Sequence, residues 1–180
     1  MMLEREKSLL VVIDVQERLL PVMSDPDRVL DRAVRAVKGC AALGVPILVT
    51  EQVPAALGPT VEALREALEP YEPITKDSFS CCGERAFVEA VDRIDPREVL
   101  LSGIESHVCV FQTARALIEA GRRVHILSDA VDSRDPENRA VALRRMEKEG
   151  AIPSSVEMAL FEMLKGASAP EFRKIVKIVK

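Results

Sequence analysis

Short aliphatic runs alternate along this chain with segments of helical periodicity, and this alternation constrains the fold more than any other feature. The run at residues 8–13 carries no charge and is rich in Leu, Val and Ile, a composition that predicts a strand buried on both faces. Other extended segments are predicted at 45–50, near 71–79, and at 99–101, 123–128 and 150–153. Because helical patterns separate them, we predict an α/β fold: an open, mostly parallel six-stranded sheet with helices on both faces, Rossmann-like and three-layered.

Turn and capping residues set the predicted helix boundaries. Asp25-Pro26 indicates a helix start and Gly44 its end. Three further helices are predicted to begin at capping side chains: Thr60, Ser106 and Ser154, the last with Glu157 in a capping box.

Polar residues follow the predicted strands at several points. Asp14, the loop after Thr50, the turn at 102–109 and the loop at 128–134 all come directly after a strand. Since right-handed crossovers bring the carboxyl ends of parallel strands to one edge of the sheet, we expect these segments to meet there. A ligand site is predicted at that edge.

Length and charge limit the classes of function. A chain of 180 residues that is 48% hydrophobic is expected to form one domain, over residues 1–180. The formal net charge of −4 comes without a basic stripe, so no nucleic-acid partner is expected. No apolar run has the roughly 20 residues of a membrane span, and residues 1–7 lack a signal-peptide core. We therefore expect no membrane partner, a cytoplasmic location and reduced cysteines.

Cys109 is the first candidate for chemistry. It lies in the first turn of the helix predicted to begin at Ser106, where backbone N–H groups and the helix macrodipole favour an anion. A thiol there is expected to be biased towards thiolate, and it could attack a carbonyl while nearby amides stabilise the oxyanion. A cysteine can equally be a small buried hydrophobic residue.

Two charged residues could support that thiol. Asp14 ends an uncharged strand, so partial desolvation should raise the pKa of its carboxyl towards the range of a proton acceptor, although a loop carboxylate is as common. Lys76 could hold the carboxylate or the thiolate by its charge, but most lysines are merely exposed. His107 does not face Cys109 at a spacing of two helical residues, so we expect it at the rim of a pocket, and His125 in the core.

Other polar groups give weaker signals. Glu51 and Arg134 could contact a polar substrate or be solvated loop residues, and the adjacent Cys81-Cys82 is expected in the core or a pocket lining. Two histidines and no HxxH, CxxC or DxHxxH pattern predict no metal site. No GxGxxG or GxxxxGK[ST] follows a strand, which disfavours nucleotide binding, and no cofactor is expected.

Three segments in order resemble the isochorismatase-like cysteine hydrolases. These are Ile13-Asp14-Val15-Gln16, Lys76 after a short strand, and the segment from Gly103 to Val110, with sequence GIESHVCV. The similarity extends over nearly the whole chain and is greatest to a small branch of that superfamily, for which the segments at 129–134 and 157–162 are also typical.

The resemblance implies a catalytic triad of Asp14, Lys76 and Cys109. In such enzymes the aspartate accepts the thiol proton, the cysteine attacks an amide or similar acyl carbon, and backbone N–H groups, here those of Glu105 and Cys109, hold the oxyanion. A non-proline cis peptide usually precedes the oxyanion residue, which corresponds to Ile104-Glu105. The expected pocket residues are Gln16, Glu51, Phe79, Ile104 and His107.

Departures from the pattern narrow the implied reaction. Nicotinamidases of the family carry a metal-binding Asp-x-His-x-x-His after the second strand, where this chain has Glu51-Gln52-Val53-Pro54-Ala55-Ala56. Isochorismatases proper lack the nucleophilic cysteine that this chain has. We therefore predict a metal-free cysteine hydrolase for a small amide or related acyl compound. The alternative is a catalytically silent thiol redox sensor or binding protein on the same fold.

The resemblance also implies self-association. Members of this family commonly form homo-oligomers, and the aliphatic C-terminal helix offers a contact face.

Overall fold

A computed structural model describes residues 2–68 and 70–180 of the chain. Met1 and Glu69, which belong to the domain predicted over 1–180, lie outside the described residues.

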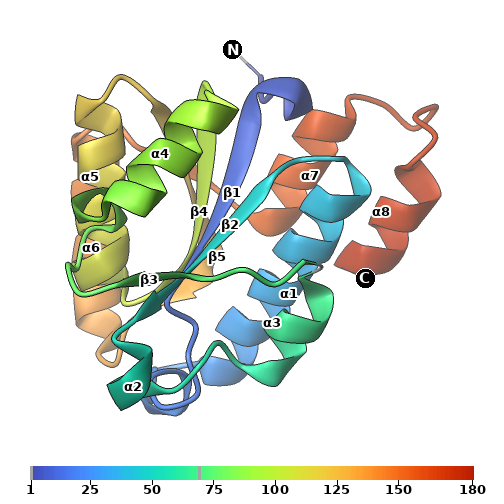
Figure 1. Cartoon of the computed structure of the whole chain (residues 1–180). Helices are drawn as coiled ribbons and strands as arrows, with labels where there is room; N and C mark the ends of the chain where they lie inside the picture. The colour runs from blue at the N-terminus through green and yellow to red at the C-terminus, as the bar shows by residue number, and fades with distance from the viewer. Residues whose placement is uncertain (1, 69) are drawn as a thin grey trace.

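One parallel sheet organises the described residues (Figure 1). Its strands follow the order β3-β2-β1-β4-β5-β6, and every neighbouring pair is parallel. Their bounds are Ser8–Ile13 (β1), Ile47–Gln52 (β2), Ile74–Lys76 (β3), Glu98–Ile104 (β4), Arg123–Asp132 (β5) and Ile152–Ser154 (β6). The predicted six-stranded α/β fold is confirmed.

Helices cover both faces of the sheet (Figure 1). One face carries α1 (Pro26–Ala42), α3 (Glu62–Ala67), α7 (Val156–Leu164) and α8 (Phe172–Val179). The other carries α4 (Arg85–Ile94), α5 (Phe111–Glu119) and α6 (Pro136–Lys148). The short α2 (Pro54–Leu57) follows β2, a π-helical turn (Ser106–Val110) precedes α5, and 3-10 turns lie at Arg5–Lys7, Leu20–Val22 and Cys81–Gly83. No helix among residues 2–68 and 70–180 is long and apolar enough to span a membrane.

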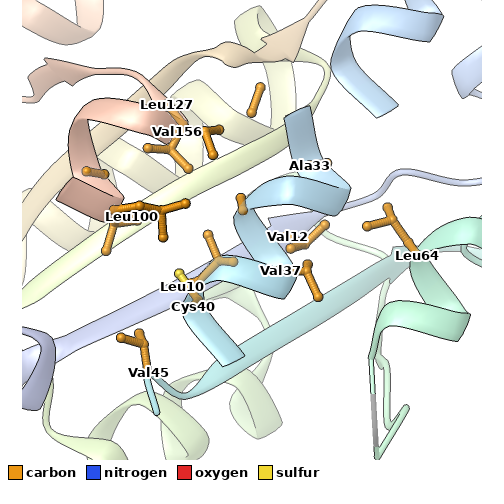
Figure 2. Close-up of a cluster of buried hydrophobic side chains, with 14 of the residues drawn as sticks. Leu10, Val12, Ala33, Val37, Cys40, Val45, Leu64, Leu100, Leu127 and Val156 are labelled. Atoms are coloured by element: carbon orange, nitrogen blue, oxygen red, sulfur yellow. The ribbon is translucent and has the colours of Figure 1, made fainter. Parts of the chain in front are cut away.

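Strand alternation divides the core into two layers. In β1, Leu10 and Val12 face the α1 side, where they lie near Val37 and Cys40 (Figure 2). Leu9, Val11 and Ile13 of the same strand face the opposite layer. All six residues of β1 are buried, which is the burial expected of a strand with no charged side chain.

Gly103 allows β4 to approach β1 closely just before the site. Its φ is +127°, and a Cβ at this position would lie 2.1 Å from the carbonyl oxygen of Ile13. Only glycine fits a backbone of this kind without strain. The contact holds β4 against the residue that precedes Asp14.

Three predicted caps are wrong because the side chains bind elsewhere or the helix starts later. The Thr60 hydroxyl donates to Glu51, and α3 begins at Glu62. The Ser106 hydroxyl donates to the carbonyl oxygen of Asp132, 2.9 Å away, instead of capping its helix. Ser155, and not Ser154, caps α7 by accepting from Met158 N. The Asp25 cap of α1 is confirmed.

The C-terminal helix uses its aliphatic face within the chain. Ile175 is fully buried, and Phe172, Ile178 and Val179 pack against the α1-side core. Part of the aliphatic face that we expected to offer to a second copy is therefore buried within the chain itself.

Candidate active site

The carboxylate of Asp14 lies at the carboxyl end of β1. The residue adopts a left-handed backbone (φ 54°) immediately after the strand and is 0% exposed. Its Oδ1 accepts a hydrogen bond from Thr50 Oγ1 at 2.8 Å, and its Oδ2 lies 2.7 Å from Lys76 Nζ. Burial raises the pKa of Asp14 against the opposing effect of Lys76.

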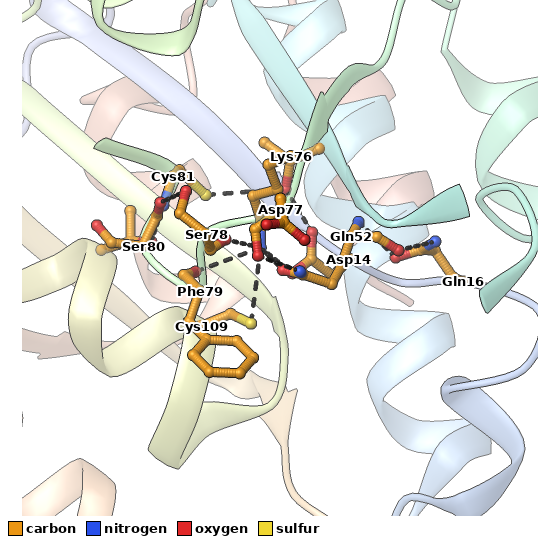
Figure 3. A network of polar contacts seen from close by, with 12 residues as sticks. Asp14, Gln16, Gln52, Lys76, Asp77, Ser78, Phe79, Ser80, Cys81 and Cys109 are labelled. Atoms are coloured by element: carbon orange, nitrogen blue, oxygen red, sulfur yellow. Dashed lines mark hydrogen bonds and ion pairs between the residues drawn. The ribbon is translucent and has the colours of Figure 1, made fainter. Parts of the chain in front are cut away.

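The ammonium of Lys76 is the centre of a buried polar network (Figure 3). Besides Asp14, its Nζ donates to Gln52 Oε1 at 2.5 Å and to the carbonyl oxygens of Ser78 and Phe79 at 3.1 and 3.2 Å. Burial alone would lower the pKa of Lys76, but the charges of Asp14 and Cys109 outweigh it and the pKa is raised. The ammonium therefore stays charged in a site without bulk water.

The thiol of Cys109 completes the cluster from the other side. Cys109 lies in the π-helical turn after β4, is 6% exposed, and its Sγ is 3.7 Å from Lys76 Nζ. Burial, followed by the negative charge of Asp14, raises the pKa of Cys109 to about 12. Our expectation of a thiolate is therefore wrong for the resting state, because burial and a nearby carboxylate outweigh the helix start.

The structure thus brings Asp14, Lys76 and Cys109 together. They come from the ends of β1 and β3 and from the turn after β4, three places at the same edge of the sheet. One ammonium contacts both a carboxylate oxygen and a sulfur atom. This arrangement can move a proton between sulfur and carboxylate while a fixed positive charge lies beside both.

Two of the predicted pocket residues bind other parts of the chain. Gln16 is fully buried; its Oε1 accepts from Gln52 N at 2.8 Å, and its Nε2 donates to the carbonyl oxygens of Gln52 and Gly58. Glu51 Oε1 accepts from the amide and hydroxyl of Thr60 and from the Tyr71 hydroxyl. These contacts hold the segment after β2 in place, so Gln16 and Glu51 are not part of the proposed substrate pocket.

The other three predicted pocket residues lie in different surroundings. Phe79, whose carbonyl contacts Lys76, is 54% exposed. Ile104 is fully buried in the α1-side core, on the opposite face of the sheet from Cys109, so its predicted place in the pocket lining is wrong. The Ile104–Glu105 peptide bond is cis. His107 is partly buried, with Nδ1 2.9 Å from Ser133 Oγ.

Thr50 and Gln52, for which the sequence predicted no role, contact the cluster, as does Cys81, which was expected in the core or a pocket lining. Thr50 and Gln52 bind Asp14 and Lys76 directly, and Cys81 Sγ lies 3.8 Å from Thr50 Oγ1. A polar Thr-Glu-Gln at the end of an otherwise aliphatic strand was the available signal. Its partner Lys76 is 24 residues away from Gln52, so the pairing could not be inferred from spacing.

Residues 2–68 and 70–180 contain no group of three or more His, Cys, Asp or Glu side chains that could hold a metal ion. The two polar side chains at the end of β2, Glu51 and Gln52, are both engaged by protein groups.

Comparison with known proteins gives matches over most of the chain. Residues 8–158 match the model of the Isochorismatase domain. Isochorismatase domain-containing protein 2 of Danio rerio is 36% identical over 98% of this chain and 89% of its own. The structure of MAR1 ribonuclease from Caenorhabditis elegans superposes with a TM-score of 0.94 at 33% identity, covering 99% of this chain and 92% of that one. The YcaC gene product of Escherichia coli, an octameric hydrolase of unknown specificity, shares the fold with a TM-score of 0.88 at 20% identity, over 98% and 95% of the two chains.

Proposed function

Since this chain belongs to the isochorismatase domain family, we propose that it is a cysteine hydrolase that cleaves a small amide or related acyl compound through a thioester. Cys109 is the nucleophile, Asp14 the proton acceptor and Lys76 the electrostatic partner of both. The observation that carries the proposal is the position of Lys76 Nζ, 2.7 Å from Asp14 Oδ2 and 3.7 Å from Cys109 Sγ in a buried cluster.

The first step forms the covalent intermediate. Asp14 takes the proton of the Cys109 thiol as Sγ attacks the acyl carbon, and the carbonyl oxygen becomes an oxyanion. The backbone N–H groups of Glu105 and Cys109 hold that oxyanion. The C–N bond then breaks, and the leaving amine takes the proton from Asp14.

The second step regenerates the enzyme. Asp14 accepts a proton from a water molecule, the resulting hydroxide attacks the thioester carbon, and the bond to Sγ breaks. The thiolate takes the proton back from Asp14, which leaves a free carboxylic acid as product. The raised pKa of Asp14 suits this work, because a carboxylate that binds protons more readily is a better acceptor and still returns them.

The central experiment compares Cys109→Ala with Cys81→Ala on a panel of small amides and thioesters. Hydrolysis should fall to background in Cys109→Ala, at least about 10³-fold, whereas Cys81→Ala removes a neighbouring buried thiol and should keep most of the activity. Mass spectrometry of the wild type with an active substrate should detect an acyl adduct on Cys109. Turnover that persists in Cys109→Ala would refute the mechanism.

Two other functions would give different results in these experiments. A thiol redox sensor would hydrolyse no member of the panel and would be oxidised selectively at Cys109 by dilute peroxide. The name of the C. elegans relative raises RNA as a substrate, against which stand the net charge of −4 and a Lys76 ammonium already bound by protein groups. RNA cleavage that requires Cys109 would favour that function.

We also propose that the protein forms a homo-oligomer in the cytoplasm. The octameric E. coli protein of this fold supports a homo-oligomer, and a monomer mass by light scattering would reject it. A small-molecule substrate and a cytoplasmic location remain predictions, the latter testable by fractionation.

A further inference from the structure

The outer side of β2 is only partly covered by β3. Pairing between the two strands is confined to residues 50–52 and Ile74–Lys76, so residues 47–49 have no strand on that side within the described part of the chain. Ile47 and Leu48 are half-buried, whereas every residue of β1 and β4 is buried. The first half of β2 is therefore an edge, although β2 lies second in the sheet (Figure 1).

Three backbone groups of this half-strand point away from the sheet without a ladder partner. The carbonyl oxygens of Pro46 and Thr50 accept from backbone N–H groups of β1 and of the residue after it, at 3.0 and 3.2 Å. Because backbone groups alternate between the two sides of a strand, those of Ile47 and Val49 point to the outer side. There β3 begins opposite Thr50, too late to pair with Ile47 or with the N–H of Val49. Two N–H groups and one C=O group thus lie in line along an open edge.

Two prolines explain why the chain does not cover this edge itself. Pro70 and Pro73 lie just before β3 and lack the N–H that a ladder needs. Between them the Tyr71 hydroxyl donates to Glu51. The segment is therefore fixed to β2 near the end of that strand and leaves the beginning of the strand uncovered.

A groove of about 630 Å³ lies along the uncovered edge. Its walls are residues 44–49 on one side and the end of α3 with Pro70 on the other. The charged side chains among its described lining residues are Glu66 and Glu72; both are exposed, and neither forms an ion pair with a described residue. The rest of that lining is aliphatic, glycine or proline. The groove thus combines free main-chain groups, an aliphatic wall and an acidic rim.

We propose that the outer edge of β2 is a docking site for an extended segment of a partner protein, which adds a strand beside residues 47–49. The main chain of that segment pairs with the three free groups, and its side chains alternate between aliphatic residues and Lys or Arg. The aliphatic side chains cover Ile47 and Leu48, and the basic ones match Glu66 and Glu72. A second copy of this chain is a poorer occupant, because edge-to-edge pairing would bring two acidic rims together.

Amide hydrogen exchange, followed residue by residue by NMR, tests the edge in the free protein. The N–H groups of Leu48 and Thr50 point to β1 and should be protected, whereas those of Ile47 and Val49 should exchange at least about tenfold faster. Equal protection of all four amides would overturn the proposal. Protection of Ile47 and Val49 that grows with protein concentration would also overturn it, in favour of a second copy on the edge.

A model peptide then tests strand addition. The probe is Val-Lys-Val-Lys-Val with blocked ends, which at millimolar concentration should slow exchange at Ile47 and Val49 by about tenfold. The same peptide N-methylated at every amide keeps its side chains but cannot donate to the edge, so it should have no effect. Unchanged exchange with the first peptide, or equal slowing with the second, would overturn the proposal.

Two double variants of equal net charge test the acidic rim. Glu66→Gln with Glu72→Gln should weaken binding of the peptide by about tenfold, the effect of losing two exposed ion pairs. The control combines Glu62→Gln with Glu89→Gln, two exposed carboxylates that do not line the groove, and should change binding by less than about twofold. Equal weakening in the two double variants would refute recognition at this rim.

Discussion

Replacing Asp14 by asparagine should have opposite effects on two properties of Cys109. Hydrolysis should be lost, because an amide cannot accept the thiol proton. Alkylation of the thiol should become faster, because the carboxylate is one of the causes that raise the pKa of Cys109 to about 12. Most substitutions that damage a nucleophile lower both rates, so this divergence is specific to the proposed roles.

The size of the effect follows from the distances. Lys76 Nζ is 2.7 Å from Asp14 Oδ2 and 3.7 Å from Cys109 Sγ, so the carboxylate oxygen and the sulfur are no more than about 6 Å apart. At an effective dielectric constant of about 20, two charges at that separation repel each other by about 3 kcal/mol, or about two pKa units. Removing the carboxylate charge should therefore raise the thiolate fraction at pH 8 by about a hundredfold.

The assay is the rate of iodoacetamide labelling at Cys109, followed by peptide mass spectrometry between pH 7 and 9. In the wild type the rate should rise about tenfold per pH unit without a plateau, since the pH stays below the thiol pKa throughout. Asp77→Asn is the matched control, because it removes an exposed carboxylate next to Lys76 in sequence. Its labelling rate should match the wild type within about twofold.

Slower labelling in Asp14→Asn would refute this reasoning. It would mean that Asp14 already holds the thiol proton in the resting state, so that removing the acceptor returns the proton to sulfur. The thiolate would then be the resting form that we expected from sequence alone.

Three further predictions follow from the same contacts. Gln52→Leu removes the acceptor that lies 2.5 Å from Lys76 Nζ and should lower kcat by about tenfold. Gln112→Leu, at an exposed glutamine of α5, should leave kcat unchanged. Equal kcat values in the two variants would contradict a positioning role for Gln52. Hydrolysis should decline as the pH falls through the pKa of Asp14, which burial has raised, because only the ionised carboxylate accepts the proton; a pH–rate profile that is flat down to pH 4 would argue against Asp14. Gly103→Ala places a methyl group 2.1 Å from Ile13 O and should lower the free energy of unfolding, measured by thermal unfolding, by more than about 4 kcal/mol. The control Gly121→Ala, whose new methyl group meets no atom within 4 Å, should lower it by about 1 kcal/mol. Similar losses in the two variants would disprove the close approach of β4 to β1.

The sequence predicts well where a single local property decides the structure. The predicted strand at 8–13 has the bounds of β1, because an uncharged aliphatic run has no stable alternative to full burial. The Asp25 cap of α1 is likewise local, since its acceptor reaches Arg28 N three residues later.

Prediction fails where partners distant in sequence decide. We predicted a loop at 128–134 after the strand at 123–128, yet β5 continues to Asp132, which is fully buried. Its oxygens accept from Ser24 Oγ and Asp25 N, and Arg28 lies 3.4 Å away. These partners, all more than 100 residues earlier in the chain, satisfy the buried carboxylate of Asp132. The local sequence around Asp132 does not reveal them.

In the candidate site, too, locally determined features could be predicted, and features that depend on distant partners could not. The edge that carries Asp14, Lys76 and Cys109 could be predicted, because parallel topology fixes where strand ends meet. The protonation state of Cys109 could not, because it depends on burial and on a carboxylate 95 residues away in sequence. Gln16 and Glu51 could not be distinguished from substrate ligands, since a polar side chain that holds a loop is of the same type as one that lines a pocket.

The geometry of Lys76 gives a reason why the proposed proton transfer can occur in a buried site. Its ammonium has three protons, and five acceptors lie within 3.7 Å: Asp14, Gln52, two backbone carbonyls and Cys109 Sγ. Before the transfer the negative charge is on Asp14, and after it the charge is on sulfur, so the net charge beside Lys76 does not change. A buried charge without a partner is costly, and a fixed cation in contact with both positions avoids that cost at each stage. A neutral hydrogen-bond donor at residue 76 would leave the anion without a compensating charge both before and after the transfer.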